Sequence, residues 1–63
     1  MIHPLADEIR YVEESYRAGK LSVGERDYLI TEIKDVRAAQ ECADNEEMIR
    51  DIVALCEVVL AIP

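Results

Sequence analysis

The sequence predicts an all-α protein: a small three-helix bundle built on a helical hairpin, in one domain that spans residues 1–63. Apolar residues recur at intervals of three and four in three segments, which is typical of one face of an α-helix. Residues that start and stop helices bound each segment. A chain this short buries only roughly 60% of its unfolded surface. We therefore expect oligomerisation or a protein partner to complete the bundle.

The first helix is expected from Pro4 to Ala18. Proline is favoured at the first helical position, where its missing N–H costs nothing. Gly19 follows the last periodic residue and can take the left-handed conformation that ends a helix. The apolar face comprises Leu5, Ile9, Val12 and Tyr16.

The second helix is expected from Val23 to Cys42. Ser22 and Glu25 have the spacing of a capping box, in which each side chain accepts a hydrogen bond from the other residue's backbone N–H. Charged residues of both signs predict that the opposite face is solvated. The predicted inner stripe comprises Leu29, Ile33, Val36, Ala39 and Ala43, with Ile30 on one side.

The third helix is expected from Asn45 to Ala61, with Asp44 as its N-cap and Glu47 completing a second capping box. The alternative is one long helix from Val23 to Ala61. We favour the turn, because a continuous helix of about 58 Å would leave most of its apolar surface uncovered in a monomer.

The last run, Ile52 to Ile62, carries a single charge in eleven residues. A helix that is apolar around its circumference is expected to be enclosed on several sides. Its β-branched residues leave a strand as an alternative, although the chain offers no second strand to pair with it. The predicted interface comprises Ile52, Leu55, Val58, Val59, Leu60 and Ile62. In the alternative, the first helix bends over this run and closes the monomer.

The formal net charge of −7 argues against direct nucleic-acid binding, which needs clustered Lys and Arg. No apolar run is long enough to span a bilayer, and the segment 1–10 lacks the features of a signal peptide. We therefore expect no membrane association and a location in the cytoplasm, or in the virion if a phage encodes the protein. Acidic residues gather in a predicted acidic patch, Glu41, Asp44, Glu46, Glu47 and Asp51. Such a patch is either a solvated surface or a site for a basic partner.

Residues with catalytic or metal-binding chemistry are sparse. His3 is the only histidine, and Cys42 and Cys56 are 14 positions apart without a CxxC or HxxxH pair. We expect His3 to be a surface or capping residue and both thiols to be reduced and buried, with a disulfide between them as the alternative. The sequence thus predicts no enzyme, no metal and no cofactor.

One segment carries a resemblance to known proteins. Residues 18–29, Ala-Gly-Lys-Leu-Ser-Val-Gly-Glu-Arg-Asp-Tyr-Leu, resemble the AGKLS-x-x-E-x-x-x-L helix–turn–helix segment of SHOCT-like modules and small phage structural and assembly proteins. Gly24 departs from the acidic residue that is more frequent at that position. The resemblance implies a virion component or assembly factor without catalysis.

Together these observations predict a non-enzymatic structural or adaptor protein that acts through helix–helix contacts. The alternative is a small acidic regulator or inhibitor that binds a basic surface of a host enzyme or DNA-binding protein.

Overall fold

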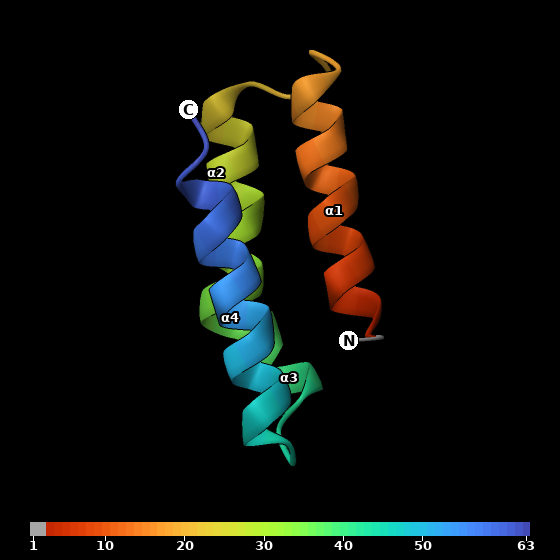
Figure 1. Ribbon diagram of the computed structural model, residues 1–63, viewed down its shortest axis with the longest axis vertical. Coiled ribbons are helices and arrows are strands. Elements are labelled where there is room, and N and C mark those ends of the chain that lie inside the picture. The colour runs from red at the N-terminus through yellow and green to blue at the C-terminus, as the bar shows by residue number, and fades with distance from the viewer. Residues whose placement is uncertain (1–2) are drawn as a thin grey trace.

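The computed structural model describes residues 3–63 and contains three helices packed side by side (Figure 1). Met1 and Ile2 of the predicted domain lie outside the described residues. The elements are α1 (Pro4–Arg17), α2 (Val23–Glu32), the π-helical turn η1 (Ile33–Arg37), α3 (Ala38–Glu41) and α4 (Glu46–Leu60). We call the continuous helix α2–η1–α3 the middle helix. The all-α class is confirmed, and no strand occurs within residues 3–63.

Local signals fix both ends of α1. The Nδ1 atom of His3 accepts a hydrogen bond from the backbone N–H of Leu5 at 3.0 Å, and Pro4 occupies the first turn. Gly19 has a φ of 78°, and the N–H of Lys20 donates to the carbonyl of Ser15 at 2.9 Å. This is the glycine-terminated helix end that the sequence predicted.

The hairpin between the middle helix and α4 is also confirmed, but the predicted N-cap was wrong by one residue. The side chain of Asn45, not Asp44, accepts the hydrogen bond from the N–H of Met48 at 3.0 Å. The N–H of Asn45 itself donates to the carbonyl of Cys42 at 2.9 Å. Asp44 therefore lies inside the turn that reverses the chain, and the next residue, Asn45, is the N-cap of α4.

The core lies between the three helices, because each contributes one apolar face. Its buried residues are Leu5, Ala6, Ile9 and Val12 from α1, Ile30, Ile33, Ala38 and Cys42 from the middle helix and its end, and Ile52, Cys56 and Val59 from α4. The predicted α1 face is confirmed for its first three members, and Tyr16 is half-buried.

The predicted inner stripe of the middle helix was largely wrong. Ile33 is buried as expected, but Leu29 and Val36 are 37% and 46% exposed, and Ala39 and Ala43 are exposed too. Ile30, Ala38 and Cys42 face the core instead. The π-helical turn explains this difference for the residues after Ile33, because its wider winding places the next core residue, Ala38, five positions further along the chain.

Arg26 is a second departure from the predicted stripe, since its side chain is buried with a residue exposure of 1%. Its guanidinium lies over the ring of Tyr16, 4.5 Å from the ring centroid, and Nη1 donates to the carbonyl of Ile62 at 2.7 Å. Nη2 donates to Asp27 Oδ1 at 2.8 Å. Arg26 thus joins α1, α2 and the segment after α4 at the end of the bundle where that segment meets the start of α2 (Figure 1).

The apolar run of α4 is enclosed mainly within the chain. α1 packs against both α2 and α4, and α4 also packs against the middle helix. Ile52, Cys56 and Val59 are buried as a result, whereas Val58 is 62% exposed. No helix in the described part of the chain is both long and apolar enough to cross a membrane.

Candidate functional site

Exposed apolar side chains concentrate on the middle helix. Among the described residues, the large apolar side chains with high exposure are Val23, Tyr28, Leu29 and Val36 there, and Tyr11 and Val58 elsewhere. Single exposed apolar residues are ordinary on protein surfaces, whereas contiguous ones mark interaction sites. The middle helix therefore carries a candidate site only if these side chains lie next to one another.

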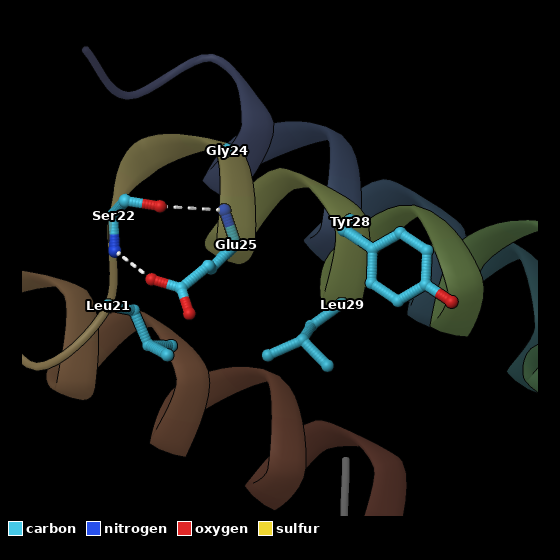
Figure 2. A pocket seen from close by; sticks show the side chains of 6 residues that line it. All are labelled: Leu21, Ser22, Gly24, Glu25, Tyr28 and Leu29. Carbon is cyan, nitrogen blue, oxygen red and sulfur yellow. Dashed lines mark hydrogen bonds between the residues drawn. The ribbon is translucent and has the colours of Figure 1, made fainter.

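A first hollow of about 490 Å³ lies where α2 begins, with Leu21, Gly24, Tyr28 and Leu29 in its lining. Figure 2 shows Leu21 and Leu29 pointing toward one another on the side of α1, with the ring of Tyr28 on the opposite side. The hollow is open beside Gly24, because a methyl group added there would have only Ser22 Oγ within 4 Å.

The predicted capping box builds one wall of this hollow. Glu25 N–H donates to Ser22 Oγ at 3.1 Å, and Ser22 N–H donates to Glu25 Oε1 at 2.8 Å (Figure 2). These bonds start α2 directly after Leu21 and fix the angle at which the chain enters the helix. The helix start and the hollow therefore depend on the same two residues.

A second hollow of about 560 Å³ lies further along the same helix, with Gly24, Tyr28 and Val36 among its lining residues. Gly24 and Tyr28 line both hollows, so the two are neighbours along the middle helix, and Thr31 and Glu32 also line the second one. We define the middle-helix surface by Leu21, Gly24, Tyr28, Leu29 and Val36. This surface gathers three of the exposed large apolar side chains, Tyr28, Leu29 and Val36, on one helix.

Four carboxylates border the middle-helix surface, and we call them the acidic border: Glu25, Asp27, Glu32 and Asp35. The hydrogen bond from the Ser22 backbone N–H lowers the pKa of the Glu25 carboxyl, so this group stays ionised at neutral pH. Asp27 pairs with the buried Arg26. Among the described residues, no basic side chain pairs with Glu32 or Asp35, so the border keeps an excess of negative charge.

The six predicted interface residues of the last run have different surroundings. Ile52 and Val59 lie in the core, whereas Leu55, Leu60 and Ile62 are half-buried. Of the six, Val58 alone is exposed, and it lies beside a hollow of about 150 Å³ between α1 and α4. Their role in contacts between chains stays a prediction.

The predicted acidic patch lies around the turn from α3 to α4. All five of its carboxylates, Glu41, Asp44, Glu46, Glu47 and Asp51, are exposed. Glu41 accepts a hydrogen bond from Arg37 Nε at 3.0 Å, and Glu46 lies 3.9 Å from Arg50. The patch therefore keeps a net negative charge at the end of the bundle opposite Arg26.

His3 and Cys42 form the one histidine–cysteine contact of the described chain, beside a hollow of about 340 Å³. His3 Nε2 lies 3.3 Å from Cys42 Sγ, while Nδ1 accepts the N–H of Leu5. A neutral imidazole that accepts at Nδ1 carries its proton on Nε2, so it donates toward the sulfur. A general base or a metal ligand would need a free lone pair on Nε2. The pair therefore caps α1 and anchors it to the end of the middle helix.

Both cysteines are free and buried, as predicted. Burial raises the pKa of the Cys56 thiol to about 11, so this thiol stays protonated and unreactive near neutral pH. No group of three or more His, Cys, Asp or Glu side chains within residues 3–63 is arranged to hold a metal ion.

Sequence reasoning missed the middle-helix surface because it assigned Leu29 and Val36 to the core. The sequence did contain a signal: Arg26, Ile30, Lys34, Ala38 and Cys42 recur every four residues and define an inner face that includes two long cationic side chains. Long cationic side chains can bury their aliphatic stems against apolar neighbours. This alternative face leaves Tyr28, Leu29 and Val36 outside.

Comparison with protein-family models, curated proteins and solved structures gives no match.

Proposed function

We propose that the protein is a non-enzymatic structural or adaptor module that binds another protein by helix–helix contacts through the middle-helix surface. The observation that carries this proposal is the set of exposed apolar side chains along the middle helix, Tyr28, Leu29 and Val36, which together with the half-buried Leu21 lie beside two successive hollows that partner side chains can enter. Amphipathic helices dock in this way, with apolar residues spaced three to four positions apart.

The middle helix is a better candidate for this contact than α4. Two of the predicted α4 residues, Ile52 and Val59, already pack inside the chain, so a partner cannot reach them without unfolding the bundle. Leu55 and Val58 retain some exposed surface on a smaller hollow, and Leu60 is half-buried. Self-association through that flank is a second contact within the same proposal.

A role in a phage particle or in its assembly is part of the proposal and rests on the resemblance of residues 18–29. The same residues supply much of the first hollow, including Leu21, Gly24 and Leu29. A cytoplasmic or virion location belongs to this proposal as well.

The second candidate function is an acidic regulator that binds a basic surface of another protein. The observation that favours it is that all five carboxylates around the α3–α4 turn are exposed. Binding through this patch would weaken steeply with salt, because exposed charges are screened within about 8 Å at physiological ionic strength.

Site-specific photo-crosslinking tests the proposal in extracts of the cells that encode the protein. A benzophenone side chain would replace Tyr28, Val36 or, as the matched control, Val58; all three positions are exposed. We expect adducts of one discrete mass from positions 28 and 36 and none of that mass from position 58, where contact between two copies would give only an adduct of twice the protein's mass. Adducts from position 58 alone would move the contact to α4. The absence of adducts at all three positions would contradict a docking role for the middle helix.

The regulator is tested by a fourth probe at Glu47 in the acidic patch. An adduct from position 47 that disappears at high salt, without adducts from positions 28 and 36, would favour the second candidate over the first.

A further inference from the structure

We infer that the occupant of the middle-helix surface is an amphipathic helix of another protein, whose apolar stripe is bordered on both sides by Lys or Arg. This inference rests on the proposed function and specifies the chemistry of the partner. The row of exposed apolar side chains sets the shape of the partner, and the acidic border sets its charge.

The length of the surface matches a short helix. The surface spans 16 residues from Leu21 to Val36, and its helical part from Val23 on is about 20 Å long. A partner helix of about four turns would place apolar residues over both hollows, with the ring of Tyr28 between them. Tyrosine is well suited to this position, because its ring covers apolar area while its hydroxyl remains in water.

The acidic border favours basic residues beside that stripe. The first hollow is lined by Glu25, and the second is lined by Asp27, Glu32 and Asp35. Cations that flank a docked helix would therefore lie close to these carboxylates. Arg26 offsets part of this charge from inside the bundle through Asp27. No basic side chain lines either hollow.

Charge also decides against a second copy of this chain as the occupant. Two copies joined through this surface would bring two acidic borders together, and like charges that face one another across an interface disfavour association. The chain has few cations to compensate, since the described basic side chains that form ion pairs within the chain are Arg10, Arg17, Arg26, Lys34, Arg37 and Arg50. Lys20 is the remaining basic residue, and it lies in the connector before Leu21.

The probes for the test are two synthetic helical peptides of 16 residues with the same leucine stripe, one flanked by lysine and the other by glutamate. Fluorescence anisotropy would measure their binding to the whole protein, and amide chemical shifts would locate the contact. We expect the lysine-flanked peptide to bind at least roughly tenfold more tightly than the glutamate-flanked peptide and to lose affinity as salt increases.

The matched variants are Val36→Lys and Val58→Lys, which change the net charge equally at two exposed positions. We expect Val36→Lys to weaken binding of the lysine-flanked peptide by roughly tenfold, because it removes apolar contact and adds a like charge. Val58→Lys should change it less than about threefold, because exposed charges far from the contact are screened. Shifts should map to Tyr28, Leu29 and Val36.

The outcomes separate the inference from the proposed function. Tighter binding of the glutamate-flanked peptide at this surface would overturn the basic partner and leave helix docking intact. Shifts at Tyr28 and Val36 that depend on protein concentration, without any peptide, would identify a second copy as the occupant and overturn the inference. Equal weakening of peptide binding by both lysine variants would show that the peptide is attracted by the overall negative charge of the protein. That result would also overturn the inference. No binding of either peptide would contradict helix docking at this surface.

Discussion

Replacement of Arg26 tests how the bundle is held together at the end that carries the middle-helix surface. Arg26 is 1% exposed, contacts the ring of Tyr16 and donates to the carbonyl of Ile62. A desolvated cation–π contact contributes up to about 2 kcal/mol. A hydrogen bond from a charged donor contributes roughly 1.5–3 kcal/mol. The cost of burying the guanidinium opposes both contributions.

The variant Arg26→Met keeps most of the aliphatic volume and removes the charge. We expect it to lower the free energy of unfolding by about 2 kcal/mol, since both contacts are lost and one burial cost is relieved. A domain of this size has a total stability of roughly 3–9 kcal/mol. A loss of 2 kcal/mol corresponds to a decrease in Tm of about 8–16 °C.

Urea unfolding followed by circular dichroism at 222 nm measures this difference. Asp27→Asn is the control, because the Asp27 side chain is half exposed and its ion pair should contribute less than about 1 kcal/mol. A double-mutant cycle with Tyr16→Leu should give a coupling energy of about 1 kcal/mol for the ring contact. If Arg26→Met is as stable as the parent or more stable, the burial cost outweighs both contacts, and Arg26 does not hold the bundle end together.

Three further predictions concern local features of the chain. Gly24→Ala should raise the free energy of unfolding by about 0.5 kcal/mol, because the added methyl group has open space in a helix. Gly19→Ala should lower it by about 1 kcal/mol, because φ is 78° at this position. Changes of the same sign for both variants in denaturant unfolding would contradict this prediction. Asn45→Ala should cost about 1 kcal/mol and Asp44→Ala clearly less, because Asn45 caps α4; the reverse order would restore Asp44 as the cap. The raised pKa of Cys56, about 11, keeps its thiol neutral in the folded state while the unfolded thiol ionises near 9.0. Stability from this group is therefore complete below pH 9 and should fall by about 1–2 kcal/mol as pH rises toward 11; a Cys56→Ala variant with the same pH profile would refute this.

The sequence was sufficient to predict the helices and the hairpin, because these depend on local signals. Pro4, the Ser22–Glu25 capping box and Gly19 act within a few residues of their own position, so their spacing alone predicts where helices begin and end. The cap at Asn45 was misplaced by one residue because Asp44 and Asn45 are both good caps, and the closure of the turn decides between them.

The orientation of the middle helix could not be obtained from the same signals. Leu29 and Val36 fit an ordinary helical stripe with Ile33, and apolar periodicity cannot reveal a π-helical turn between Ile33 and Arg37. Burial of Arg26 likewise depends on contacts with Tyr16 and Ile62, which are remote in sequence. The middle-helix surface follows from these two tertiary features, and the spacing of four residues from Arg26 to Cys42 is the sequence signal that agrees with them.

The most direct test of the docking surface is competition between the lysine-flanked peptide and the partner captured by the benzophenone at position 36. We predict that saturating peptide lowers the yield of this adduct severalfold, because both ligands occupy the row from Leu21 to Val36. An adduct yield at position 36 that the bound peptide leaves unchanged would contradict the assignment of this surface as the site where the partner helix docks.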